Sequence, residues 1–168
     1  NPWVFNVRAP YQREAERAVQ HLSLIGIERI GIVHVEDSFG ADLVEGAKKG
    51  FDAVAKQPVF VEKYNREKWD FAKIAPRVAA SDAQAVLFIG TGIAAAEGID
   101  AIRKAGSRAQ IVTFSNNASG GFVKSLGDPA VRFGGDLTGA RSTGNIFFGG
   151  MRGPGVGETM GVGSWTID

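Results

Sequence analysis

The sequence predicts an α/β protein with a doubly wound parallel sheet, in which helices cover both faces to give three αβα layers. Two observations indicate this class. Short apolar runs rich in β-branched residues recur along the first 133 residues, and amphipathic segments follow them in regular alternation. Strands that alternate with helices pair in parallel through right-handed crossover connections. We therefore expect one sheet with helices packed on each side of it.

Five segments have the pattern of strands. The run RIGIVHV is long enough and sufficiently β-branched for a strand that is buried on both faces. Pro58 opens the next run, at the position where a missing backbone N–H does least harm. The expected strands span residues 3–8, 29–35, 58–64, 85–89 and 110–114.

Five segments have the pattern of helices. In the second of them, apolar residues from Leu43 to Val54 recur at spacings of three and four, which makes one apolar face. Asp70 is a suitable N-cap for the third helix, and Pro76 is expected to kink or break that helix. The expected helices span residues 11–26, 40–56, 70–81, 94–106 and 120–127.

The last part of the chain differs in composition from the rest. Residues 1–133 contain 12 of the 23 glycines and residues 134–168 contain the other 11, with no sustained helical or strand period. Such a chain loses much conformational entropy on ordering and has few side chains to bury. We therefore expect one folded unit over residues 1–133, followed by an irregular glycine-rich tail over residues 134–168.

Composition excludes several classes of function. The net charge is +1, which gives no basis for a nucleic-acid or membrane surface. No apolar run approaches the roughly 18 residues that a membrane-spanning helix needs. Cysteine is absent, so disulfides, thiol catalysis and cysteine-based zinc sites are excluded.

The fold class itself points to one edge of the sheet. In open parallel sheets, ligands bind in the loops beyond the carboxyl ends of the strands. In this sequence those loops are residues 36–40, 64–69, 90–92 and 115–117.

One of these loops has the pattern of a dinucleotide-binding turn. Gly90, Thr91 and Gly92 follow a buried strand and precede a helix, as in the G-x-G-x-x-G/A fingerprint. However, the fingerprint normally opens the first βαβ unit, and no carboxylate follows the next strand to hold a ribose. We favour a tight turn that lines another ligand, while a nucleotide-binding enzyme domain of the Rossmann type stays an alternative.

Catalytic and metal sites are poorly supported. His21 lies on the polar face of the first helix, His34 lies within a buried strand, and the two do not have a metal-ligand spacing. Asp37 follows a strand as a phosphoacceptor aspartate would, but the lysine expected after a late strand is missing. We expect no enzymatic activity, no metal and no cofactor.

The chain also resembles a known family. The stretches ERIGIVHVEDSFG, YNREKWDFAKIAPRVAASDAQAVLF and IRKAGSRAQIVTFSNNAS follow one another as in type I periplasmic binding proteins of ABC importers. The resemblance is to the branched-chain amino-acid-binding (Leu/Ile/Val) group and covers about residues 3–130, beyond which the tail departs from the family pattern.

The resemblance implies a periplasmic protein of two lobes that closes on a small solute, an amino acid or a carboxylate, and is then recognised by a membrane permease. This chain corresponds to the carboxyl-terminal lobe only, and its exposed inter-lobe face could pair two copies. A ligand-sensing domain of a receptor or transcriptional regulator would share the fold and stays an alternative.

The resemblance also implies where a solute would bind. Phe39 matches an aromatic residue that packs on the ligand, and a capping role for its ring is equally compatible with its position. Arg8 could hold a carboxylate or form a hinge ion pair. The full set of expected ligand-binding residues is Arg8, Phe39, Thr91, Gly92, Ser115 and Asn116.

Overall fold

The computed structural model of the chain describes residues 9–117, 122, 146–150 and 161–164. The helices are α1 (Tyr11–Leu24), α2 (Ser38–Ala53), α3 (Phe71–Ala80) and α4 (Gly92–Lys104), and a 3-10 turn, η1, spans Ser115–Asn117. The strands are β1 (Ile30–Val35), β2 (Val61–Tyr64), β3 (Ala85–Ile89), β4 (Gln110–Phe114), β5 (Ile146–Gly150) and β6 (Gly161–Ser164). Two expected elements and one expected site residue lie outside the described residues. They are the strand over residues 3–8, the helix over residues 120–127 except residue 122, and Arg8.

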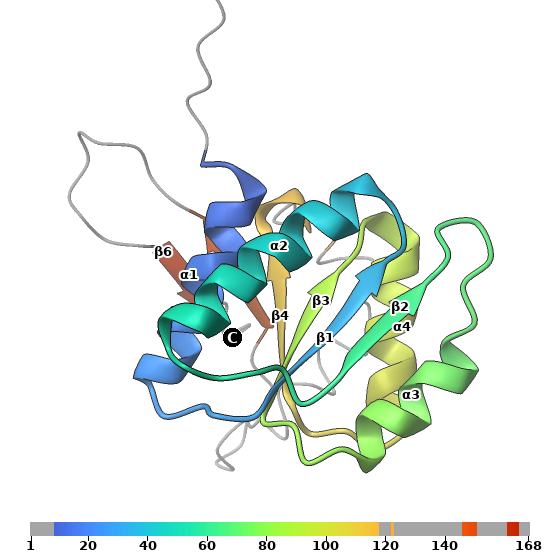
Figure 1. The fold of residues 1–168 in the computed structure, drawn as a ribbon. Helices are drawn as coiled ribbons and strands as arrows, with labels where there is room; N and C mark the ends of the chain where they lie inside the picture. Colours follow the sequence, from blue (N-terminus) through green and yellow to red (C-terminus); the bar gives the residue numbers. More distant parts are fainter. Residues whose placement is uncertain (1–8, 118–121, 123–145, 151–160, 165–168) are drawn as a thin grey trace, which may run out of the picture.

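The strands form one sheet in the order β2-β1-β3-β4-β5-β6 (Figure 1). The first five strands pair in parallel, and β6 pairs with β5 in the antiparallel direction. This architecture confirms the predicted doubly wound α/β class. Because β2 lies on one side of β1 and β3 lies on the other, the chain reverses its direction of winding between β1 and β3.

Two apolar cores hold the helices to the sheet. Along β3, Val86 and Phe88 face the core beneath α3 and α4, while Leu87 and Ile89 face the core beneath α1 and α2. All five residues of β3 are buried. A strand covered on both faces needs apolar residues at every position, which is why its sequence reads as a continuous apolar run. Figure 1 shows α1 and α2 together on one side of this sheet.

The third helix is not broken at Pro76, so this part of the prediction is wrong. Pro76 lies inside α3, which runs continuously from Phe71 to Ala80. A proline removes one backbone hydrogen bond from a helix. In α3, the side chains of Phe71, Ile74, Ala75 and Val78 are buried against the core, and this burial offsets the lost bond.

The predicted tail contains regular structure. Two of its segments, β5 and β6, extend the sheet beyond β4. The sequence signal for them is weak because glycines surround one short apolar run, Ile146–Phe148. The structure therefore differs from the irregular segment that we expected, and the domain boundary at residue 133 stays a prediction. Within the described residues, no helix is long and apolar enough to cross a membrane.

Candidate functional site

The candidate site is the edge of the sheet where β1, β2, β3 and β4 end, and we call it the carboxyl rim. It consists of the loops that contain Asp37, Arg66, Thr91 and Asn116. Parallel pairing of the four strands brings these loops to the same edge. The rim is thus the location that the sequence predicted for a ligand site.

The loop after β1 is built by Asp37. Its backbone is extended, and its carboxylate oxygen Oδ1 accepts a hydrogen bond from the Gly40 N–H at 2.9 Å. Asp37 is therefore the N-cap of α2, which begins at Ser38 rather than at the predicted residue 40. From the sequence, Asp37 was considered only as a phosphoacceptor, and the structure gives it a capping role.

Phe39 occupies the first turn of α2 and is half-buried. Its ring packs edge-on against the ring of Tyr11, with centroids 5.2 Å apart and an interplanar angle of 85°. It also packs against the cores on both faces of the sheet. These contacts show that Phe39 seals the top of the sheet, which was one of its two predicted roles.

Arg66 connects three of the loops. It follows β2, and its Nε donates to Asp37 Oδ2 at 2.5 Å while its Nη1 donates to Thr91 Oγ1 at 3.0 Å. The guanidinium group is therefore held between the loop after β1 and the loop after β3. The side chain of Arg66 is exposed, but these two partners fix the position of its head group.

These contacts control the ionisation of Asp37. Partial burial alone would raise the pKa of its carboxyl group. Hydrogen bonds from Arg66 and from the Gly40 N–H more than offset that effect and lower the pKa below its usual value. Asp37 therefore carries a full negative charge at neutral pH, paired with the guanidinium group.

The loop after β3 explains the glycines of the apparent nucleotide fingerprint. A Cβ atom at Gly90 would overlap the hydroxyl oxygen of Tyr64 and crowd the ring of Phe88. Gly92 has a φ of +55°, a conformation that costs other residues free energy. Both glycines are required by the packing and geometry of the turn, which favours the tight-turn interpretation over a pyrophosphate site.

Thr91 is half-buried, and the first two residues of α4, Gly92 and Ile93, are exposed to solvent. Thr91 is the N-cap residue of α4, but its side chain makes no capping hydrogen bond and instead accepts from Arg66. Ile93, in the first turn of α4, is 68% exposed. The rim therefore combines a polar group with an exposed apolar side chain.

The loop after β4 is held by internal hydrogen bonds. Ser115 donates from its backbone N–H and from its hydroxyl to the buried carboxylate of Glu14, at 3.1 and 2.5 Å. Asn116 and Asn117 each donate from the side-chain amide to the carbonyl oxygen of Gly90 at 2.9 Å. These contacts tie the end of β4 to α1 and to the loop after β3.

The structure thus places Phe39, Thr91, Gly92, Ser115 and Asn116 in loops at one rim, and their role in binding a solute stays a prediction. The residues that support the rim, which were not predicted in this role, are Arg66, Asp37, Glu14 and Asn117. For Arg66, the available signal was its position two residues after the end of β2, inside a loop already expected to reach the rim.

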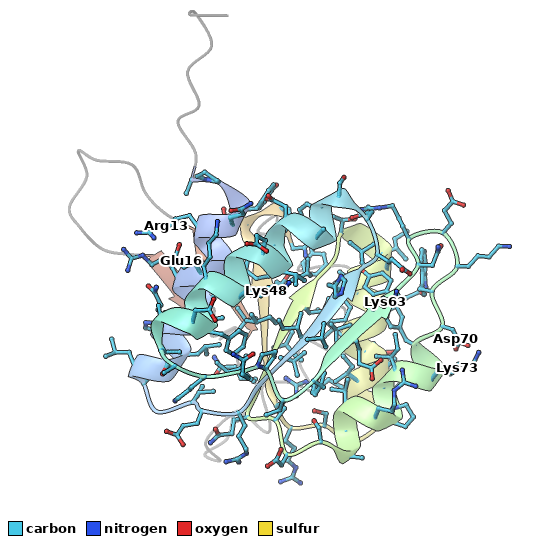
Figure 2. The ribbon with its side chains drawn as sticks, in the orientation of Figure 1. Arg13, Glu16, Lys48, Lys63, Asp70 and Lys73 are labelled. Carbon is cyan, nitrogen blue, oxygen red and sulfur yellow. The ribbon has the colours of Figure 1, made fainter. Side chains whose placement is uncertain are left out.

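Other charged side chains lie away from the rim. Figure 2 shows Arg13 and Glu16 on α1 and Asp70 and Lys73 at the start of α3, and both pairs are ion pairs on the surface. His34 is half-buried, and its Nδ1 lies 2.9 Å from the carbonyl oxygen of Val35. Among the described residues, no group of three or more potential metal ligands is present.

Comparison with known proteins defines the class. A family model described as periplasmic binding protein matches residues 1–156. The chain therefore belongs to the periplasmic binding protein family, and this match continues past residue 133. A comparison with curated proteins found no significant match.

Solved structures support the assignment. A substrate-binding periplasmic protein from Ralstonia solanacearum is 28% identical with a TM-score of 0.70, over 77% of this chain and 37% of that protein. Two further structures share the fold. An extracellular ligand-binding receptor from Verminephrobacter eiseniae is 24% identical with a TM-score of 0.65, over 88% of this chain and 39% of that protein.

The second of these further structures is a Rhodospirillum rubrum protein assigned to branched-chain amino acid ABC transport. It is 18% identical with a TM-score of 0.70, over 88% of this chain and 39% of that protein. The chain thus spans well under half the length of these relatives.

Proposed function

We propose that the chain is the carboxyl-terminal lobe of the solute-binding component of an ABC importer, and that it binds a small polar solute at the carboxyl rim. Membership in the periplasmic binding protein family supports a binding role, and we propose no catalytic step. A periplasmic location and a membrane permease as partner belong to the same proposal.

The observation that carries the proposal is the position of Arg66. Its guanidinium group is held by Asp37 and Thr91, between the ends of β1 and β3. The winding direction of the sheet reverses between these two strands. Helices α2 and α4 leave this point toward opposite faces, and such a point is where open α/β sheets bind ligands.

The solute class follows from the chemistry of the rim. Arg66 suits a carboxylate, and the neutral side chains of Thr91, Ser115 and Asn116 suit a polar solute. A fold relative from Rhodospirillum rubrum is assigned to branched-chain amino acid transport. We therefore propose an amino acid or a small carboxylate as the solute, with Phe39 and Gly92 completing the contacts of this lobe and Arg8 adding a contact from the connecting segment.

One lobe supplies only part of such a site. The chain spans 37% of the Ralstonia solanacearum protein, which leaves a second lobe to provide the remaining contacts. If a micromolar site of about −8 kcal/mol divides its binding free energy equally, one lobe retains about −4 kcal/mol, a Kd of about 1 mM. We therefore expect this chain alone to bind its solute weakly.

A thermal-shift measurement tests the proposal. The chain is heated with 20 mM butyrate, succinate, L-leucine or L-glutamate, and with glucose as an uncharged control. At a Kd of about 1 mM, the bound solute stabilises the fold by about 1.8 kcal/mol. This corresponds to a rise in Tm of about 4–7 °C for a chain of this size. Calorimetry on the same samples should show no micromolar binding.

Two results would contradict the proposal. If no amino acid or carboxylate raises Tm above the glucose control, solute binding is wrong. If calorimetry gives a micromolar Kd for this chain, the division of the site between two lobes is wrong. Pairing of two copies through the inter-lobe face stays a prediction, which sedimentation velocity tests.

A further inference from the structure

We infer that Arg66 is the residue that receives the solute in this lobe, and that the solute presents an anionic group to it. This inference rests on the proposed function and narrows it. Among amino acids and carboxylates, the group facing this lobe is a carboxylate and not an ammonium group.

Arg66 has more hydrogen-bond donors than its two contacts use. An arginine side chain has five N–H donors in a planar fork. The contacts with Asp37 and Thr91 use Nε and Nη1, and within the described part of the chain Nη2 has no recorded partner. The side chain of Arg66 is 46% exposed, so these remaining donors are accessible. A carboxylate can accept two parallel hydrogen bonds from such a fork.

Asp37 balances the positive charge of Arg66 only in part. Asp37 faces Arg66, but its carboxylate also accepts from Gly40 at the start of α2, where the helix dipole favours a negative charge. The negative charge of Asp37 is therefore shared between the guanidinium group and the positive end of the α2 dipole. The guanidinium group keeps a net attraction for a further anion, while Asp37 fixes its position.

Three carboxylates near the rim, those of Asp37, Glu36 and Glu14, are potential partners for an ammonium group. Glu36 forms an ion pair with Lys63 at 2.5 Å. Glu14 is buried and accepts two hydrogen bonds from Ser115. Together with Asp37, these carboxylates already have donors, so an ammonium group would have to displace one of them or bind Glu67, which is exposed to solvent.

Three compounds with the same carbon skeleton test the inference. Butyrate, butyramide and butylamine carry a negative charge, no charge and a positive charge, and their apolar tail suits the exposed Ile93. Each is titrated into ¹⁵N-labelled chain at neutral pH and constant ionic strength. The Arg66 Nε–H signal and the Thr91 amide signal report binding. We expect butyrate to shift both signals at millimolar concentration, and the other two compounds to bind at least about tenfold more weakly.

Matched variants make the test specific. Arg66→Gln should weaken butyrate binding at least about tenfold, which is the loss expected for one charge-assisted hydrogen bond. Arg66→Lys keeps the charge without the fork, so its Kd for butyrate should lie between those of the wild type and of Arg66→Gln. Lys68→Gln removes the same charge two residues away and should change the Kd less than twofold. Unchanged circular dichroism spectra establish that each variant is folded.

The results separate this inference from the proposed function. If butylamine binds as well as butyrate, or if Arg66→Gln binds butyrate as the wild type does, the role of Arg66 is overturned while solute binding at the rim stands. If neither these compounds nor the amino acids and carboxylates of the thermal-shift series affect the chain, the proposed function fails as well.

Discussion

The side-chain amide of Asn117 donates a hydrogen bond to the carbonyl oxygen of Gly90 at 2.9 Å and so ties the end of β4 to the loop after β3. The same amide donates to Thr113 Oγ1 at 2.7 Å, and Asn117 is buried. Asn117→Ala should therefore lower the free energy of unfolding by about 2 kcal/mol, measured by urea denaturation, because buried acceptors lose their donor.

Asn65→Ala is the control for this prediction. The side-chain oxygen of Asn65 also accepts two backbone hydrogen bonds, from Glu67 and Lys68, but it does so in an exposed turn. Water can replace these bonds, so the loss should stay below about 1 kcal/mol. Equal losses for the two variants would show that Asn117 does not hold the rim together.

The turn at Gly90 gives a second prediction. Gly90→Ala places a methyl group against the hydroxyl of Tyr64 and should cost about 2 kcal/mol of stability. Tyr64→Phe removes that hydroxyl, so Gly90→Ala should cost at least about 1 kcal/mol less in the Tyr64→Phe background. Thermal or urea unfolding of the wild type, the two single variants and the double variant measures this difference in stability cost.

Gly92 is the control position for the prediction at Gly90. A Cβ atom there meets nothing within 4 Å, but the φ of +55° makes the backbone strained for alanine. Gly92→Ala should cost about 1 kcal/mol whether residue 64 is Tyr or Phe. If Tyr64→Phe relieves both glycine variants equally, steric contact with the Tyr64 hydroxyl is not the reason for Gly90.

The ion pair at the rim predicts a pH dependence. The pKa of Asp37 lies below its usual 3.8 in the folded chain, so its ionised form stabilises the fold above that pH. This contribution is lost as the pH falls through the folded-state pKa. Asn is also a good N-cap, so Asp37→Asn removes mainly the charge. The wild type should be the more stable chain at neutral pH, and the difference should shrink on acidification below pH 3.8.

Urea denaturation across this pH range measures the effect. Arg66→Gln should reduce the pH dependence, because it removes one of the hydrogen bonds that lower the pKa of Asp37. A stability difference between wild type and Asp37→Asn that is constant with pH would contradict the assigned contacts.

The ring contact between Tyr11 and Phe39 predicts an energetic coupling. The rings lie 5.2 Å apart in an edge-on arrangement that connects α1 to the loop after β1. A double-mutant cycle with Tyr11→Leu and Phe39→Leu should give a coupling free energy of about 0.5–1.5 kcal/mol. If the stability losses of the two single variants add up to the loss of the double variant, the two rings do not interact and are buried independently.

Much of the fold could be predicted from the sequence. The bounds of β3 and β4 match the prediction, because strands covered on both faces are continuous apolar runs with clear ends. The starts of α2 and α4 were each predicted two residues late. Their first residues follow the N-caps Asp37 and Thr91 and do not belong to the buried apolar stripe, so helical periodicity does not detect them.

The candidate site was predictable only in part. Parallel strands fix which loops reach the rim, and this is sufficient to place Thr91 and Ser115. The contacts of Arg66 depend on β2 lying next to β1 and on the path of the loop that follows, and neither can be read from residue spacing. Long-range hydrogen bonds such as Glu14 to Ser115 join positions that the sequence gives no reason to pair.

Intermolecular NOEs from the methyl protons of butyrate to the labelled chain test most directly whether solute binds at the carboxyl rim. We expect NOEs to the amide protons of Thr91, whose hydroxyl contacts the Arg66 guanidinium group, and of Ile93, which follows two residues later. Leu24 and Ile25, which are exposed where α1 ends and the chain turns toward the start of β1, serve as the contrasting apolar surface. NOEs confined to Leu24 and Ile25, with none at the rim, would contradict the account.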